Sequence, residues 1–317
     1  MRILVTGATG FAGGHLVEAL LAHGNKHILG VARQAVWPDV WSNLADRVEL
    51  RSCDVCDRVA LEAILRDLRP ERIYHLAGYP HVGRSFQEPE AAWQGNLTAT
   101  RSLYDAVTRW GGRPRILFVG SGLVYGESET AALGCDERCL LLPDNPYAAS
   151  KAAADLMSYQ TTRHPGLDIV RVRPFNHIGP HQSPQFAVSS FARQLAAIEH
   201  GRQTPVLETG NLQPRRDLTD VRDVVAAYVL LLERGRTGEV YNVGSGQTYA
   251  MQTVLDRLIA LSGVTVEVQQ KASLIRATDV AVIRANTDKL RRETDWSPRF
   301  TLDQTLTDTL AYWRGQP

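Results

Sequence analysis

The turn that follows the first apolar run constrains the fold of this chain more than any other feature. The run RILVT is followed by G-A-T-G-F-A-G, and a helical pattern over residues 11–24 begins inside that turn. Glycines at this spacing allow a tight strand-to-helix turn and let backbone N–H groups approach a pyrophosphate at the helix N-terminus. The turn therefore predicts a βα unit that binds a dinucleotide. The residues expected to contact the cofactor here are Gly7, Gly10, Phe11, Ala12 and Gly13.

Short β-rich runs alternate with helical patterns through the first half of the chain. Such alternation predicts an α/β fold: a doubly wound parallel sheet of the Rossmann type, with strand order 3-2-1-4-5 and helices on both faces. The expected strands cover 2–7, 27–33, 48–54, 72–78, 115–121 and 169–175, and the expected helices cover 11–24, 57–69, 89–110 and 146–163.

The pattern changes after residue 175. Residues 176–220 are rich in Pro, Gly, Gln and Arg, with one helical piece near 187–200. A helix–strand pair then returns, and residues 251–317 read as mostly helical with a β-like run at 264–269. The expected division is a dinucleotide-binding Rossmann domain of 1–175 with 221–245, and a smaller, discontinuous, mostly helical nucleotide-sugar-binding lobe of 176–220 with 246–317.

The composition is typical of a soluble globular enzyme. Of 317 residues, 44% are hydrophobic, and 35 basic residues nearly balance 34 acidic ones for a net charge of +1. No basic surface for nucleic acid is indicated, so an anionic ligand must be met by local arginines. No apolar run reaches the length of a membrane span, and the N-terminus has no signal-peptide pattern. We expect a cytoplasmic protein without nucleic-acid or membrane partners.

Four cysteines raise the possibility of a zinc site. Cys53 and Cys56 have C-x-x-C spacing, and Cys135 and Cys139 form a looser pair. In the expected strand order, however, the third and fifth strands lie four spacings apart, roughly 19 Å at about 4.8 Å each. The two pairs should therefore be far apart, and we expect no metal. A disulfide framework is not expected in so large a cytoplasmic chain.

The ends of the second and third expected strands indicate the form of the dinucleotide. Arg33 follows the glycine turn by roughly 20 residues, where an acidic residue would bind the ribose hydroxyl of NAD and an arginine suits a 2′-phosphate. Asp54 and Val55 are placed to meet the adenine. The sequence therefore favours NADPH, with NADH still possible.

Chemistry is indicated by a serine after the fifth expected strand and by a tyrosine–lysine pair. Ser121 opens S-G-L-V-Y-G, and N-P-Y-A-A-S-K follows with Tyr147 and Lys151 four residues apart. Residues at this spacing share a helix face, so the two side chains are neighbours. A nearby ammonium stabilises phenolate, and we therefore expect the Tyr147 pKa to fall from about 10.

Together these motifs resemble the extended short-chain dehydrogenase/reductases of the nucleotide-sugar branch. The segments RPFNHIGPHQS, GNLQPRRDLTDVRD, VYNVGSG and R-A-T-D are similar to those of the GDP-4-keto-6-deoxymannose reductases. The similarity spans nearly the whole chain. It implies that Ser121 hydrogen-bonds the sugar C4 oxygen, that Tyr147 donates the proton, and that Lys151 holds the nicotinamide ribose. Leu76, Ala77, Gly78 and Pro174 are further cofactor contacts.

The resemblance also implies a diphosphate-sugar site in the C-terminal half. Asn176 meets the sugar diphosphate, Arg216 and Arg276 clamp it, and Asp279 accepts from the nucleoside. Arg193, on the helical piece, is a weaker candidate. The family further implies a homodimer through a four-helix bundle, although the helices concerned could equally pack within one subunit.

One departure limits the activity. Related 4,6-dehydratases carry a glutamate where this chain has Leu123, and leucine cannot remove the sugar C5 proton. The implied function is therefore NAD(P)H-dependent reduction of a nucleotide-linked 4-keto-6-deoxysugar, with GDP-4-keto-6-deoxymannose to GDP-rhamnose favoured. A nucleotide-sugar 4-epimerase with tightly bound NAD is the alternative within this chemistry. A non-catalytic dinucleotide-binding sensor is the alternative from another class.

Overall fold

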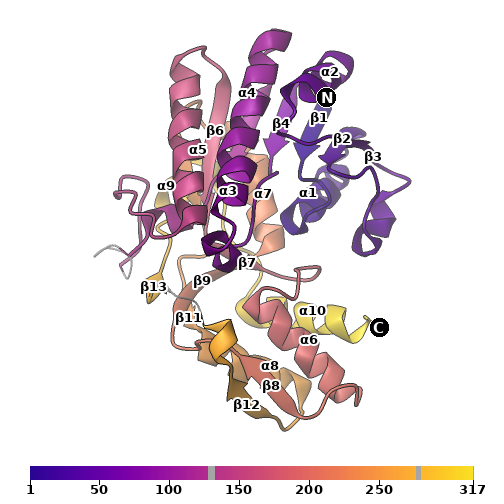
Figure 1. The fold of residues 1–317 in the computed structure, drawn as a ribbon, viewed down its shortest axis with the longest axis vertical. Helices are drawn as coiled ribbons and strands as arrows, with labels where there is room; N and C mark the ends of the chain where they lie inside the picture. Colours follow the sequence, from indigo (N-terminus) through magenta and orange to yellow (C-terminus); the bar gives the residue numbers. More distant parts are fainter. Residues whose placement is uncertain (128–132, 276–279, 317) are drawn as a thin grey trace.

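A computed structural model describes residues 1–127, 133–275 and 280–316. Its larger part, at the top of Figure 1, is built around a parallel seven-stranded sheet. The strand order is β10-β6-β5-β4-β1-β2-β3. The strands are β1 Arg2–Thr6, β2 His27–Ala32, β3 Glu49–Ser52, β4 Arg72–His75, β5 Arg115–Val119, β6 Asp168–Pro174 and β10 Val240–Val243. The predicted doubly wound α/β fold and the order 3-2-1-4-5 are confirmed, and β6 and β10 extend the sheet beyond β5.

Helices cover both faces of this sheet because successive strand residues point to opposite sides. In β1, Ile3 and Val5 pack in one buried cluster, and Leu4 packs in the other. The first cluster is closed by α1 Phe11–Ala22, α7 Val221–Arg234 and α9 Asp288–Thr294. The second is closed by α2 Arg58–Leu68, α4 Ala99–Trp110 and α5 Pro146–Arg163.

The helix predicted over 89–110 is not regular throughout. It comprises α3 Pro89–Trp93, a π-helical turn at Gln94–Thr98 and then α4. A π turn inserts an extra residue into the α-helical repeat, so side chains before and after it change face. This insertion places Asn96 in the interior, where it is 1% exposed.

The smaller part of the molecule has a core of its own, seen at the bottom of Figure 1. Strand β9 lies between β11 and β13 and also pairs with β7, while β8 pairs with β12. The strands are β7 Asn176–Ile178, β8 Val206–Thr209, β9 Arg215–Asp220, β11 Thr248–Ala250, β12 Glu267–Gln270 and β13 Val282–Ile283; the helices are α6 Ala187–Glu199, α8 Met251–Ser262 and α10 Leu302–Arg314. Short 3-10 turns are η1 Asp39–Leu44, η2 Gly83–Phe86, η4 Gly122–Tyr125 and η5 Ala272–Leu274.

The chain after residue 246 does not belong entirely to the smaller part of the molecule. Leu290 of α9 and Trp296 pack in the same cluster as α1 and α7, although both follow residue 246. The lobe boundaries expected from the sequence therefore stay a prediction. Within the described ranges, none of the helices combines the length and apolarity that crossing a membrane requires.

Candidate active site

The carboxyl edge of the large sheet gathers most of the predicted cofactor and catalytic residues. Parallel strands place their C-terminal ends at one edge, and ligands of such sheets bind in the crevice outside that edge. Each candidate follows or ends a strand: the glycine turn follows β1, Arg33 follows β2, Asp54 and Val55 follow β3, Leu76, Ala77 and Gly78 follow β4, Ser121 follows β5, and Pro174 ends β6.

The glycine turn leaves the start of α1 open to an anion. Gly10 precedes α1 without a side-chain cap, and the first turn of the helix has no acidic residue. Gly13 must lack a side chain, because a Cβ there would lie 2.1 Å from the Gly7 carbonyl oxygen. The first-turn N–H groups thus carry the partial positive charge of the helix end without a competing carboxylate. This cradle fits the pyrophosphate of a dinucleotide.

Arg33 and Asp54 lie at neighbouring strand ends. Arg33 directly follows Ala32, and Asp54 lies two residues after Ser52; Ala32 and Ser52 are partners in the β2–β3 ladder. Ser52 Oγ donates to the Arg33 carbonyl oxygen at 2.8 Å. Both side chains are exposed, whereas Val55 is buried. A cationic and an anionic side chain therefore flank one end of the crevice.

Ser121 and Tyr147 are positioned by two helix starts. Ser121, 5% exposed, precedes η4, and its Oγ accepts from Leu123 N at 3.2 Å. The Asn145 side chain caps α5 by accepting from Ala148 N at 2.9 Å, which places Tyr147 in the first turn of that helix. The Ser121 hydroxyl is close enough to the Tyr147 phenol to lower the pKa of that phenol.

Lys151 lies one turn further along α5 and is 7% exposed. Its Nζ donates to the Val119 carbonyl oxygen at 3.0 Å, and burial lowers its pKa to about 8. A Cβ at Gly78 would lie 3.2 Å from this Nζ, so the segment after β4 packs directly against the ammonium. The three predicted catalytic side chains are therefore brought to one place.

The expected lowering of the Tyr147 pKa is wrong for this arrangement. Burial raises the pKa of the phenol, and the neighbouring Ser121 hydroxyl offsets only part of that effect. The ammonium of Lys151 is itself buried and bonded to a carbonyl oxygen. Tyr147 consequently remains protonated at neutral pH, which is the state that a proton donor requires.

Asn96 was missed by the sequence analysis. Its Oδ1 accepts from Tyr79 N at 2.9 Å, and its Nδ2 donates to Ser150 Oγ at 2.9 Å. Ser150 Oγ in turn donates to the Tyr147 carbonyl oxygen at 2.8 Å. Asn96 therefore ties the segment after β4 to the turns of α5 that carry Tyr147 and Lys151. Only the π turn brings it there, and a periodicity of 3.6 residues gives no sign of that turn.

A buried cluster of charged side chains joins α5 to β6. Asp155 is 1% exposed and accepts from both Arg171 Nη1 and Arg173 Nε at 2.6 Å. Arg173 Nη1 also donates to Tyr125 Oη at 2.9 Å, at the end of η4. The cluster thus fixes α5 relative to the strand that ends at Pro174.

The predicted substrate residues are only partly brought together. Asn176 is exposed on β7, and Arg193 is exposed on α6. Arg216 is 8% exposed, and its Nη1 donates to the Val280 carbonyl oxygen at 2.7 Å. Arg276 and Asp279 lie outside the described residues. Arg216 is therefore held beside the chain segment that directly follows those two candidates.

In the part of the chain that the structure describes, no group of three or more His, Cys, Asp or Glu could hold a metal ion. Burial raises the pKa of both Cys53 and Cys56 to about 11, which disfavours the thiolate that zinc binds.

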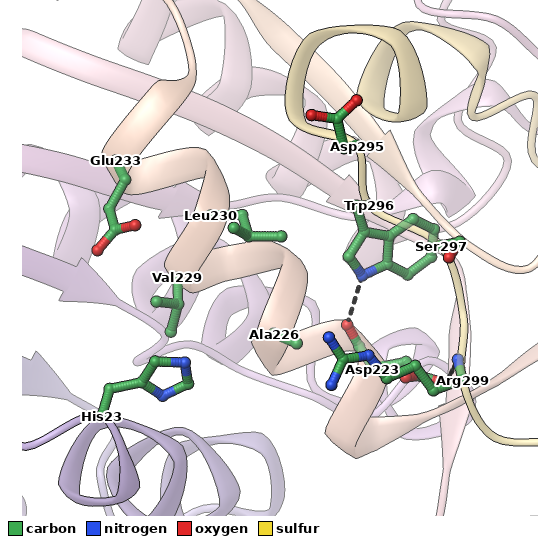
Figure 2. A pocket seen from close by; sticks show the side chains of 10 residues that line it. All are labelled: His23, Asp223, Ala226, Val229, Leu230, Glu233, Asp295, Trp296, Ser297 and Arg299. Atoms are coloured by element: carbon green, nitrogen blue, oxygen red, sulfur yellow. Dashed lines mark hydrogen bonds between the residues drawn. The ribbon is translucent and has the colours of Figure 1, made fainter.

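A hollow of about 200 Å³ lies away from the predicted residues, between the end of α1, α7 and the segment before α10 (Figure 2). Trp296 Nε1 donates to the Asp223 carbonyl oxygen there at 3.0 Å, and the Arg299 guanidinium lies beside Asp223. None of the residues lining the hollow is a candidate for the chemistry described above.

Known proteins resemble this chain over almost its full length. Residues 4–309 match the model of a family described as GDP-mannose 4,6 dehydratase. The GDP-6-deoxy-D-mannose reductase of Pseudomonas aeruginosa is 34% identical over 315 residues, or 99% of this chain and 98% of that protein. RMD from Pseudomonas aeruginosa complexed with NADPH has a TM-score of 0.85 at 33% identity, covering 99% of both chains. The Thermus thermophilus UDP-glucose 4-epimerase complex with NAD has a TM-score of 0.88 at 29% identity, also over 99% of both chains.

The doubly wound sheet, the glycine turn and the Ser–Tyr–Lys group at the sheet edge define an NAD(P)-dependent enzyme of the extended short-chain dehydrogenase/reductase class. The match to the family model covers residues of both parts of the molecule. Within that class, the chain belongs to the GDP-mannose 4,6-dehydratase family.

Proposed function

We propose that this enzyme reduces the C4 keto group of a nucleotide-activated 6-deoxysugar with NADPH, and that GDP-4-keto-6-deoxymannose is converted to GDP-rhamnose. The observation that carries the proposal is the grouping of Ser121, after β5, with Tyr147 and the buried Lys151, one turn apart on α5. Likeness to a GDP-6-deoxy-D-mannose reductase and to an NADPH complex supports the choice of sugar and cofactor.

In this mechanism NADPH supplies the hydride, and the chain's own residues bind, orient and move the proton. Ser121 polarises the C4 oxygen, and the Tyr147 phenol donates its proton to that oxygen as charge develops on it. Lys151 contributes a cation at the ribose side of the crevice and favours the phenolate that remains after transfer. Leu123 offers no base for elimination at C5, so reduction is favoured over dehydration.

The binding roles are those that the sequence predicts. The first turn of α1 and the Leu76–Gly78 segment hold the dinucleotide, Arg33 meets its 2′-phosphate, and Asp54 and Val55 meet its adenine. Pro174 backs the nicotinamide. On the sugar side, Asn176 meets the diphosphate, and Arg216 and Arg276 clamp it, for which guanidinium geometry is well suited. Asp279 accepts from the nucleoside, and Arg193 is a weaker candidate for the same site.

The test is NADPH consumption, followed by absorbance, with freshly generated GDP-4-keto-6-deoxymannose. We expect a decay that depends on both protein and sugar, and that is faster with NADPH than with NADH. Absence of decay, together with NAD released when the purified protein is denatured, would instead establish the 4-epimerase. The observation that supports this alternative is the fold likeness to a UDP-glucose 4-epimerase. Unchanged turnover in Tyr147→Phe would refute the mechanism.

We also propose that the enzyme is a cytoplasmic homodimer in which α4 and α5 of two subunits form a four-helix bundle. These helices lie on one face of the sheet, and Leu156 and Tyr159 of α5 are 58% and 46% exposed. Light scattering should give twice the chain mass of 35.1 kDa. Replacing Leu156 by Glu should shift that mass to the monomer value, and a monomeric wild-type protein would contradict the proposal.

A further inference from the structure

His181 has a backbone conformation that side chains rarely adopt, in the segment between β7 and α6. Its φ is +70°, and the other described non-glycine residues with positive φ are Arg69 and Asp295. Those two cap the C-terminal ends of α2 and α9, where a left-handed residue is ordinary. His181 follows the strand β7 and ends no helix. Such outliers persist where surrounding contacts hold them and are concentrated at functional sites.

The contacts that hold His181 come from three separate elements. Its ring centroid lies 4.3 Å from that of Trp41, 4.7 Å from that of Tyr312 and 5.5 Å from that of His15. Trp41 belongs to η1, His15 to α1 and Tyr312 to α10. The imidazole therefore lies between the helix that begins at the glycine turn and the C-terminal helix of the smaller part.

On the cofactor side, two residues contact the His181 ring: His15, which belongs to α1, and Trp41, which packs against that helix. The His15 ring lies 5.6 Å from that of Phe11, in the first turn of the helix, and His15 Nε2 donates to the Pro180 carbonyl oxygen at 3.0 Å. The Trp41 ring covers Gly14 so closely that a Cβ there would fall 2.0 Å from it. These contacts connect the first turn of α1 to the segment that carries His181.

On the substrate side, Tyr312 belongs to a helix that shares a core with α6. Leu306 and Leu310 of α10 are fully or almost fully buried in one cluster with α6. Trp313 Nε1 donates to Ser189 Oγ on α6 at 3.0 Å, and Ser189 Oγ donates to the Gln182 carbonyl oxygen at 2.6 Å. Helix α6, which carries Arg193, is thus fixed to the residue next to His181.

We propose that His181 is a positioning residue that couples dinucleotide binding at α1 to the placement of α10 and α6 around the nucleoside diphosphate. The inference rests on the proposed function, because it takes both binding sites from it. Its ring gives α1, η1 and α10 a common contact, so occupancy of one site favours the arrangement that the other site needs. Coupling of this kind is reciprocal between the two ligands.

The experiment measures GDP binding by calorimetry with and without saturating NADP⁺. In the wild-type protein we expect NADP⁺ to tighten GDP binding by about 5- to 10-fold, and GDP to tighten NADP⁺ binding by the same factor. His181→Gly and His181→Asn both tolerate positive φ but remove the ring. Each should reduce the coupling below about 2-fold while leaving the affinity for NADP⁺ alone nearly unchanged.

Two variants of Tyr312, the residue of α10 that contacts the His181 ring, complete the design. Tyr312→Phe retains the ring and should keep the coupling, whereas Tyr312→Ala should lose it. Full coupling in His181→Gly, or no coupling in a wild-type protein that binds both ligands, would overturn this inference and leave the proposed function standing. A wild-type protein that binds neither NADP⁺ nor GDP would overturn both.

Discussion

Replacing Asp155 by Asn tests the buried charge cluster that joins α5 to β6. The Asp155 side chain is 1% exposed, and those of its partners Arg171 and Arg173 are 9% and 5% exposed. Both guanidinium groups donate to it at 2.6 Å. A neutral amide can accept from one arginine but presents its NH₂ group to the other, and both buried cations lose their counter-charge. Breaking a buried pair in this way costs about 3–5 kcal/mol.

The assay is the free energy of unfolding from denaturant titration, with Asp168→Asn as the matched control. Asp168 pairs with Arg115 at 3.2 Å, but its side chain is 38% exposed, so this loss should be within about 1 kcal/mol. The cluster also holds the helix that carries Tyr147, and we therefore expect turnover by folded Asp155→Asn to fall as well. If both variants lost the same small amount of stability, the reasoning from burial would be refuted.

Three further predictions concern the chemistry. Tyr147→Phe should lower kcat about 10²- to 10⁴-fold while NADPH still binds, as followed by NADPH consumption and a fluorescence titration; equal loss of binding would argue against a proton-transfer role. Burial lowers the pKa of Lys151 to about 8, so between that value and the ordinary 10.5 the unfolded chain binds more protons and stability rises with pH. Lys151→Met should remove this rise, at most about 3 kcal/mol, and parallel stability curves for the two proteins would contradict the assignment. Arg33→Asp should shift the ratio of kcat/KM for NADPH over NADH by about 10- to 100-fold toward NADH, and an unchanged ratio would remove Arg33 from the cofactor site.

The sheet and its ligand-binding edge could be predicted because their signals are local. Apolar runs of strand length alternate with helical spacing, and the right-handed βα connection then leaves few possible strand orders. The glycine turn, Ser121 and the Tyr147–Lys151 pair follow strands or occupy one helix face. Their proximity therefore follows from topology alone, before any side-chain contact is known.

Other features depend on partners far away in the chain. The strand β9 reads R-R-D-L-T-D and does not look like a buried strand, yet Asp217 is fully buried. Its carboxylate accepts from Ser245 N and Gly246 N at 2.9 Å and from Ala285 N at 3.1 Å. These donors compensate for the burial of the charge, and local sequence does not reveal them.

The sequence by itself determined the class of fold, the dinucleotide turn and the side chains that are candidates for the reaction. The tertiary structure decided the pKa of the candidate proton donor and brought residues that are distant in the sequence into contact. Tyr147 has a raised pKa because of burial, Asn96 reaches α5 through a π turn, and His181 joins α1 to α10. The physical reason is that hydrogen-bonding periodicity and turn chemistry act between near neighbours, whereas desolvation and packing depend on segments that only the folded chain brings together.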